Sequence, residues 1–346
     1  MKEPQHLLGL FCAPIGETVY LGLRYGTATA LPLHHFLPIA SMIEARNLIK
    51  KFGSLTAVNN LSLTIREGET IGLLGPNGAG KTTTIGMLVG LTSSDSGDVE
   101  IHKGKNSHEL AQSGAPSQVS VRNRIGVAPQ TLSLYEELTA TENLKFFGSL
   151  YNLSGKSLKK RITTSLEFAG LQDRHNDKVS TFSGGMKRRL NIAVALTHQP
   201  EFILLDEPTV GVDPQSRNHI FERIEEMQKA GMTILYTTHY MEEAQRLCDR
   251  VAIMDSGKIL ALDTVDALLE QHGSRPVVSA VLHPQSSRNG LPTTPDGDSI
   301  RFESDDPIAQ IGQLTDSGVQ FQSLQIANSD LESVFLKLTG RQLRDD

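Results

Sequence analysis

One short segment constrains the fold more than any other: a glycine-rich loop between an apolar run and a predicted helix. Residues 70–74 read as a short buried strand, and apolar residues recur from Ile85 to Leu91 as in a helix. Strand, glycine-rich loop and helix in this order form the context that a phosphate-binding loop requires. A chance glycine loop is the alternative, and these flanking elements disfavour it. The loop consists of Gly75, Pro76, Asn77, Gly78, Ala79, Gly80, Lys81, Thr82 and Thr83.

The spacing within this loop predicts a nucleotide site. The pattern G-x-x-x-x-G-K-[ST] is matched by Gly75, Gly80, Lys81 and Thr82. Glycines allow the backbone to turn several N–H groups toward one point, and the following helix adds its positive N-terminal end. Lys81 would reach the β- and γ-phosphates, and the Thr82 hydroxyl would bind Mg²⁺. We therefore expect the loop to bind a nucleotide together with Mg²⁺.

A second segment supplies the acidic residues that such a site needs. The apolar run 202–205 reads as a buried parallel strand and ends in Asp206, Glu207 and Pro208. In open α/β sheets ligands bind beyond the carboxyl ends of the strands, where these two carboxylates would meet the phosphates. Asp206 suits the Mg²⁺ shell, and Glu207 suits orienting or deprotonating the attacking water. A solvated Asp-Glu turn is the alternative, which the pairing with the loop disfavours.

Another glycine motif precedes a second predicted helix. Ser183 is a good N-cap residue, and the backbone N–H groups of Gly184 and Gly185 beside it would form a further anion site. One nucleotide does not need two such sites. A head-to-tail pair of subunits explains both, because each subunit would offer this motif to the nucleotide held by the other. Plain helix capping is the alternative.

Together these motifs resemble the nucleotide-binding subunit of ABC transporters, over residues 43 to about 262. The segment 181–186 (Thr-Phe-Ser-Gly-Gly-Met) resembles the signature sequence of that family, with Phe182 and Met186 at positions where Leu and Gln are commonest. The resemblance implies an α/β fold of the P-loop NTPase type. It has a mixed sheet core, an antiparallel β lobe and a helical subdomain at about residues 131–198. ATP and Mg²⁺ are the implied cofactors, and a homodimer is the implied assembly.

The same resemblance assigns roles to four further residues. Gln130 resembles the glutamine loop, which would touch Mg²⁺ or water and report the nucleotide state to a membrane partner. Asp213, in the segment 210–213, resembles the loop that crosses between paired subunits. His239, after the predicted strand 233–237, resembles the switch histidine that contacts the γ-phosphate. Phe52 resembles the aromatic residue that stacks on adenine; a core phenylalanine is the alternative.

Three parts of the chain are expected, with boundaries at residues 1–41, 42–272 and 273–346. The first lacks a regular period and a cleavage site, so we interpret it as a disordered tail or spurious N-terminal extension rather than a signal peptide. The last predicts a small α+β unit of order β-β-α-β-α, with an amphipathic final helix. Its end, 331–341, resembles the C-terminal domain of ABC exporters in the daunorubicin-resistance (multidrug) group. The final helix carries Leu331, Val334, Phe335 and Leu338 on one face.

Composition excludes several other classes of protein. Only two cysteines occur in 346 residues, which excludes a disulfide scaffold and a Cys-rich zinc site. The net charge is −6 and no apolar run reaches the ~18 residues of a membrane span, so a membrane role would be peripheral or through a partner. Two basic runs, 159–161 and 187–189, could suggest nucleic acid. With aromatic residues at 5%, solvated helix faces are the favoured interpretation, and no nucleic acid is expected.

The predicted function is ATP hydrolysis for an ABC-2 type exporter, which would move a drug, lipid or other hydrophobic cargo through a separate membrane permease. The chain would lie at the cytoplasmic face of the cell membrane, bound to that permease. A soluble ATPase of the same superfamily, acting on ribosomes or DNA, is the alternative. Translation-associated relatives usually carry two cassettes, and chromosome-associated relatives insert a long coiled coil. Here only about 125 positions, without a heptad run, separate Lys81 from Asp206.

Overall fold

The computed structural model describes residues 41–104, 113–286 and 298–340. The expected N-terminal tail therefore lies outside the described residues, apart from Ser41, which opens the first strand. Within the described ranges, no helix is both long and apolar enough to cross a lipid bilayer.

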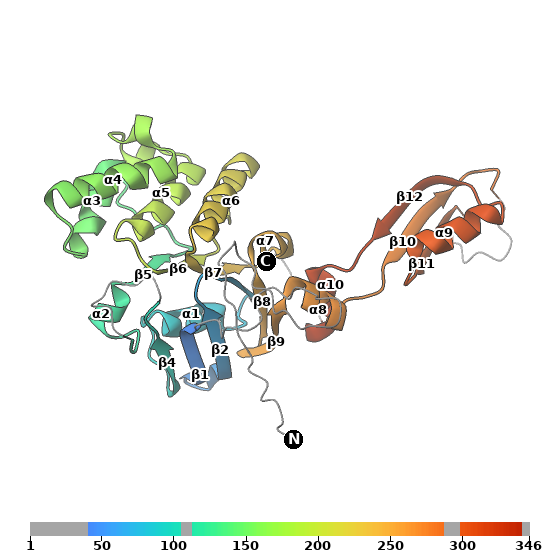
Figure 1. The fold of residues 1–346 in the computed structure, drawn as a ribbon, viewed down its shortest axis with the longest axis horizontal. Helices are drawn as coiled ribbons and strands as arrows, with labels where there is room; N and C mark the ends of the chain where they lie inside the picture. The colour runs from blue at the N-terminus through green and yellow to red at the C-terminus, as the bar shows by residue number, and fades with distance from the viewer. Residues whose placement is uncertain (1–40, 105–112, 287–297, 341–346) are drawn as a thin grey trace, which may run out of the picture. The chain divides into compact units, whose positions relative to one another are not determined.

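The core is a six-stranded sheet whose strand order brings the predicted site segments together (Figure 1). Five strands run parallel, and the edge strand β9 runs antiparallel to β8. Because β3 and β6 both flank β7, the carboxyl ends of these three strands lie side by side. In spatial order the strands are β5 (Ile125–Ala128), β6 (Phe202–Asp206), β7 (Thr233–Thr238), β3 (Thr70–Leu74), β8 (Arg250–Asp255) and β9 (Lys258–Thr264).

Both faces of this sheet are covered, which explains its continuous apolar strands. In β6, Phe202 and Leu204 pack into the cluster that contains α1 (Lys81–Leu88), whereas Ile203 and Leu205 pack into the cluster that contains α6 (Pro214–Lys229). The prediction of a buried parallel strand before the two acids is therefore confirmed. Two shorter helices complete this part, α7 (Met241–Leu247) and α8 (Val265–His272).

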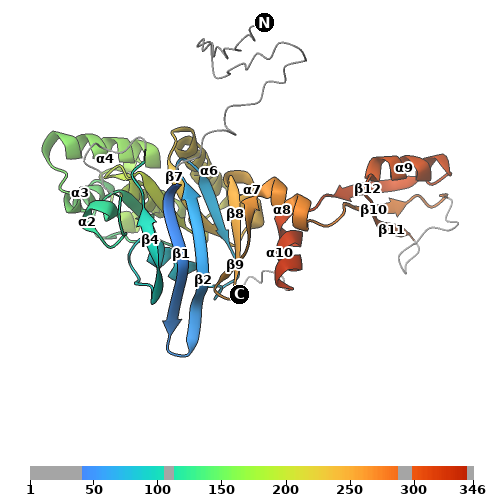
Figure 2. The same ribbon diagram turned by 60° about the horizontal axis from the view of Figure 1, so that its bottom comes forward.

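A second sheet forms the antiparallel lobe, and Figure 2 shows β1 and β2 as its long paired strands. Residues Leu61, Leu63 and Ile65 of β2 are buried and alternate with exposed neighbours, as expected for a strand with one buried face. These residues join the α1 cluster, so the lobe packs beside the phosphate-binding helix. The strands in spatial order are β2 (Leu55–Arg66), β1 (Ser41–Phe52) and β4 (Ser96–Ile101).

The expected helical subdomain has a hydrophobic cluster of its own, to which Leu144, Leu166 and Leu190 contribute. Thr139 and Glu142 form a capping box at the first of its helices, which fixes where that helix begins. The longer helices are α3 (Ala140–Leu150), α4 (Gly155–Ala169) and α5 (Gly184–Leu196). Single turns of helix lie nearby at α2 (Val119–Arg122), η2 (Gln172–Arg174) and η3 (Val179–Thr181).

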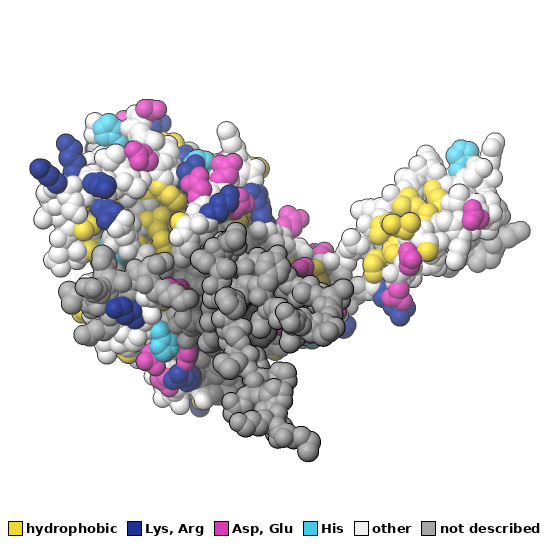
Figure 3. Space-filling view, viewed as in Figure 1, with side chains coloured by type: hydrophobic (Ala, Val, Ile, Leu, Met, Phe, Trp, Pro, Cys, Tyr) yellow, Lys and Arg dark blue, Asp and Glu magenta, His cyan; other side chains and the backbone are white. Residues whose placement is uncertain are grey.

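The C-terminal part forms a three-stranded antiparallel sheet with one helix, as the sequence predicts. Its small cluster contains Ala280, Leu282 and Ile300, and several apolar side chains remain on its surface (Figure 3). The elements are β10 (Val277–Leu282), β11 (Ser299–Glu303), α9 (Pro307–Asp316) and β12 (Phe321–Ala327). The domain boundary between residues 272 and 273 stays a prediction.

The last helix, α10 (Leu331–Thr339), is placed differently from the expectation. We predicted it as part of the small α+β unit, but its buried face packs against α7 and α8. Leu331 and Phe335 are fully buried in one cluster with Leu74, the residue directly before the phosphate-binding loop. The amphipathic pattern is confirmed, and the correction concerns only the surface that its apolar face meets.

Candidate nucleotide-binding and catalytic site

Two glycines of the phosphate-binding loop, Gly75 and Gly80, lie where no side chain fits. A Cβ atom on Gly75 would lie 2.3 Å from the carbonyl oxygen of Met254, and one on Gly80 would lie 2.3 Å from that of Ala57. Gly80 also has a φ angle of +100°, which side chains strongly disfavour. The loop is thus pressed against two backbone segments and holds its shape at the start of α1.

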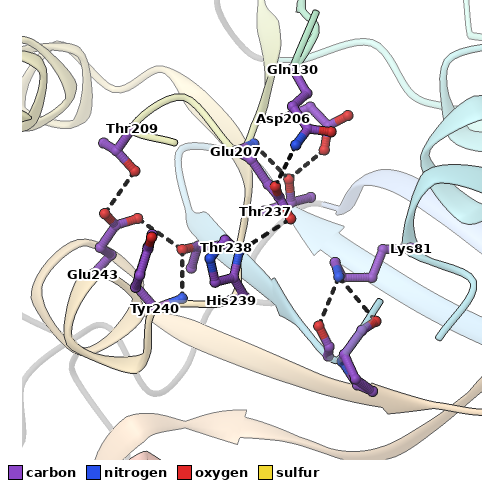
Figure 4. A network of polar contacts seen from close by, with 12 residues as sticks. Lys81, Gln130, Asp206, Glu207, Thr209, Thr237, Thr238, His239, Tyr240 and Glu243 are labelled. Atoms are coloured by element: carbon purple, nitrogen blue, oxygen red, sulfur yellow. Dashed lines mark hydrogen bonds and ion pairs between the residues drawn. The ribbon is translucent and has the colours of Figure 1, made fainter. Parts of the chain in front are cut away.

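Lys81 points back over this loop (Figure 4). Its Nζ donates hydrogen bonds to the carbonyl oxygens of Gly75 at 2.7 Å and Pro76 at 3.2 Å, and the residue is only 7% exposed. Burial lowers the pKa of the Lys81 ammonium, and the nearby carboxylates of Glu207 and Asp206 oppose that shift. A buried positive charge therefore lies inside the loop, where it can pair with phosphate.

Thr237 fixes the two predicted acids at the end of β6. Its hydroxyl donates to Asp206 Oδ1 at 2.6 Å and accepts the backbone N–H of Glu207 at 3.0 Å. Glu207 has a φ angle of +44°, a conformation that a side-chain-bearing residue adopts only where its surroundings hold it. This turn directs the Asp206 and Glu207 carboxylates from the sheet edge into the site.

The Glu207 carboxylate contacts two other residues predicted for the site, Gln130 and His239 (Figure 4). The Gln130 side-chain amide donates to Glu207 Oε2 at 2.8 Å. The His239 Nδ1 atom lies 3.4 Å from Glu207 Oε1. Glu207 is 8% exposed, so its carboxylate is shielded from most bulk water. A carboxylate held between an amide donor and an imidazole is suited to orient a water molecule and take its proton.

A cavity of about 480 Å³ connects the loop with these acids. Phe52 lines it and is 54% exposed, so this ring is not a core residue. His239 lines a neighbouring cavity of about 550 Å³ instead. The predicted residues that line the first cavity are Phe52, Pro76, Asn77, Gly78, Gly80, Lys81, Thr82, Thr83, Gln130, Asp206 and Glu207.

The donor atoms on this cavity fit a magnesium ion. Thr82 brings a hydroxyl oxygen, Asp206 a carboxylate and Gln130 an amide oxygen. Mg²⁺ prefers hard oxygen ligands and is commonly held by one or two carboxylates plus the phosphates of the substrate. These are the three residues predicted as magnesium ligands from the sequence.

The signature residues lie elsewhere in the chain, beside Asp213. Ser183 caps α5 by accepting the backbone N–H of Met186 at 3.3 Å, which confirms its predicted capping role. Asp213 caps α6 by accepting the N–H of Ser216 at 2.9 Å. A Cβ atom on Gly185 would lie 2.2 Å from Ser216 Oγ, so the two helix starts touch. Ser183 and Ser216 line a cavity of about 540 Å³ that is separate from the one at the loop.

The structure corrects our interpretation of the basic run 187–189 as a solvated helix face. We expected a solvated helix face, but Arg188 is 6% exposed and donates to the carbonyl oxygens of Pro129 at 3.1 Å and Gln130 at 2.8 Å. Burial lowers the pKa of its guanidinium. Asn191 also donates to Pro129, at 3.3 Å. Arg188 and Asn191 share one face of the helix at i, i+3 spacing, but this spacing does not identify the carbonyl groups that they bind.

The fold and the site define an ATPase of the P-loop class, with a helical subdomain inserted between its loop and its acids. Residues 58–210 match the family model described as ABC transporter. The linearmycin resistance ATP-binding protein LnrL of Bacillus subtilis is 40% identical over 319 residues, which cover 88% of this chain and all of that protein. The Nod factor export ATP-binding protein I of Burkholderia lata is 39% identical over 89% of this chain and all of its own length.

Solved structures agree with these relatives. The ATP-binding subunit of an ABC transporter superposes with a TM-score of 0.57 at 31% identity, over 66% of this chain and 92% of that one. A dimeric ATP-binding cassette in a post-hydrolysis state, bound to ADP and Pi, gives 0.56 at 28% identity, over 64% and 98%. The chain belongs to the ABC transporter family, as an ATP-binding protein that hydrolyses ATP with Mg²⁺. The predicted family, fold class and cofactors are thereby confirmed.

Proposed function

We propose that this chain is the ATPase subunit of an ABC-2 type exporter and drives efflux of a hydrophobic cargo through a separate membrane permease. The relatives that support this are named for linearmycin resistance and for Nod factor export, and they match along nearly the whole chain. In this role the protein lies at the cytoplasmic face of the membrane and is held there by its permease.

The observation that carries the catalytic proposal is the placement of Glu207 between Gln130 and His239 at the sheet edge. Glu207 orients the attacking water and accepts its proton. Lys81 balances charge on the transferring phosphoryl group, and Phe52 stacks on adenine. Thr82, Asp206 and Gln130 hold Mg²⁺, which when bound adds positive charge beside the phosphates.

Glu207→Gln tests the catalytic assignment. The amide keeps the size of the side chain but cannot take a proton, so ATP binding is expected to persist while turnover falls by about 100-fold or more. Glu167→Gln on α4 is the matched control, since Glu167 is exposed and lies outside the site. Turnover by Glu207→Gln at the rate of the control would remove Glu207 from this role.

The separate location of the signature residues supports a head-to-tail homodimer. In this dimer Ser183, Gly184 and Gly185 of one copy complete the nucleotide site at the loop of the other. Each site then needs Lys81 from one chain and the signature from its partner.

Mixing two inactive variants tests the dimer. Lys81→Ala disables the loop, and Gly184→Glu obstructs the signature at a position where a Cβ would meet nothing closer than 3.9 Å within its own chain. Each variant alone is expected to be inactive, whereas a mixture restores part of the ATPase activity through hybrid dimers. A mixture as inactive as its components would contradict the shared site.

Membrane fractionation in mild detergent, followed by mass spectrometry, tests the permease. Recovery of a protein with several membrane spans that co-purifies with the wild-type chain is the expected result. Recovery only in the soluble fraction, together with ribosomes or nucleic acid, would instead favour the alternative of a soluble ATPase.

A further inference from the structure

Glu243 is a buried acidic residue that the proposed mechanism does not use. It lies in the first turn of α7 and is 4% exposed. Its carboxylate accepts hydrogen bonds from the hydroxyl groups of Thr209 at 2.7 Å and Thr238 at 2.8 Å (Figure 4). The Tyr236 hydroxyl donates a third hydrogen bond to it, at 2.8 Å. Burial of a carboxylate is unfavourable unless its oxygens are hydrogen-bonded, and here three donors converge on them.

The donors come from the two segments that carry the proposed catalytic pair. Thr209 follows Glu207 by two residues, on the path to the cap of α6. Thr238 directly precedes His239 at the end of β7. Glu243 therefore joins the segment of the acid to the segment of the histidine, on the side of the site away from Gln130.

The contact with Thr238 acts on the backbone around His239. The Thr238 hydroxyl donates its one proton to Glu243 and accepts the backbone N–H of Tyr240 at 2.9 Å. A hydroxyl group has a single proton, so the hydrogen bond to Glu243 fixes the orientation of the Thr238 O–H. A lone pair of the same oxygen is then free to accept the N–H of Tyr240. The residues on both sides of His239 are thereby tied to one carboxylate.

We propose that Glu243 is a positioning residue that sets the separation between His239 and Glu207, which is 3.4 Å in this structure. The inference rests on the catalytic roles proposed for those two residues. Glu243 touches neither the nucleotide cavity nor the reacting atoms, and it acts through Thr209 on one side and Thr238 on the other.

Glu243→Gln in the full-length chain tests this role. The amide keeps the volume but turns one acceptor into a donor that faces hydroxyl protons. We expect kcat for ATP to fall by about 10- to 100-fold, as for the loss of a hydrogen bond to a charged group, with KM changed by less than about twofold. Glu242→Gln is the matched control, since it removes the same charge from the same helical turn at an exposed position. This control should keep the wild-type kcat.

A double-mutant cycle separates positioning from general destabilisation. Thr238→Val removes one donor, so Glu243→Gln combined with Thr238→Val should lower kcat little further than Glu243→Gln alone. Should Glu243→Gln fail to fold, the single variants Thr209→Val and Thr238→Val must each lower kcat on their own.

Two results would overturn the inference: wild-type kcat in Glu243→Gln, or a parallel loss of nucleotide affinity and kcat, which a merely structural role produces. Glu207→Gln and His239→Ala are measured alongside. If those two retain turnover, the proposed catalytic roles are wrong. If they lose it while Glu243→Gln does not, only the inference about Glu243 is wrong.

Discussion

The variant Phe335→Ala tests whether the last helix belongs to the core of the nucleotide-binding part. Phe335 is fully buried in the cluster that contains Leu74 and Met241. Leu74 directly precedes the phosphate-binding loop, and Met241 opens the helix after His239. Loss of the aromatic ring would therefore loosen the support beneath two segments of the site.

The size of the effect follows from burial. Truncation of a buried phenylalanine removes its transfer free energy and leaves a cavity, which costs about 3–5 kcal/mol. A loss of that size lowers the melting temperature on the order of 10 °C. Leu336→Ala is the matched control on the same helix, because Leu336 is 40% exposed and should cost about 1 kcal/mol or less.

The assay is thermal unfolding with and without Mg²⁺ and ATP. A ligand that binds the native state raises the transition of the part that binds it, so the nucleotide identifies the ATPase transition. We expect Phe335→Ala to lower that transition and Leu336→Ala to leave it nearly unchanged. If Phe335→Ala lowers only a transition that ATP does not shift, α10 belongs energetically with β10–β12, and the reasoning from the cluster is refuted.

Three further predictions concern the loop, the acids and pH. Gly80→Ala should weaken ATP binding at least about tenfold in a nucleotide titration, because its Cβ would lie 2.3 Å from Ala57 O and its φ is +100°. Thr237→Val should lower kcat by about tenfold in a steady-state ATPase assay, because Asp206 and Glu207 lose their shared anchor. Burial lowers the pKa of His198 from 6.5 to about 4, so only the unfolded chain takes up this proton between those values. Stability is then complete above pH 6.5 and falls by about 3 kcal/mol as the pH drops to 4, and His198→Gln should flatten this part of a urea-unfolding profile.

The sequence predicted those parts of the site whose residues lie next to one another in the chain. The loop around Lys81 and the acids at Asp206 and Glu207 each form one short segment, with spacing that the phosphate chemistry dictates. Gln130 and His239 were assigned to the nucleotide site by the family resemblance, and the structure brings both to Glu207 because the parallel strands β5, β6 and β7 end at one edge of the sheet.

The side-chain contacts between segments that are distant in the chain could not be predicted from the sequence. The amphipathic pattern of α10 shows which face is apolar, but not whether that face meets β10–β12 or α7 and α8. Arg188 was assigned to solvent because a run of basic residues usually faces water. Its burial depends on carbonyl groups 58 and 59 positions away, at Gln130 and Pro129.

These long-range contacts connect the signature helix to the acid. Ile192 and Ala195, in the second half of α5, pack in the cluster beside β6, whereas Arg188 lies in the first half, near the Ser183 cap. A tilt of α5 about its second half would thus move Arg188 together with the Gln130 carbonyl that it binds. The Gln130 side chain donates a hydrogen bond to one carboxylate oxygen of Glu207. A tilt that weakened this hydrogen bond would leave that oxygen available to accept a proton from water. On the opposite side of the site Glu243 binds Thr209 and Thr238, in the segments that carry Glu207 and His239, and these contacts do not involve α5. In the proposed dimer, contact of a second subunit with Ser183 would by this route reach Glu207, the proposed catalytic carboxylate.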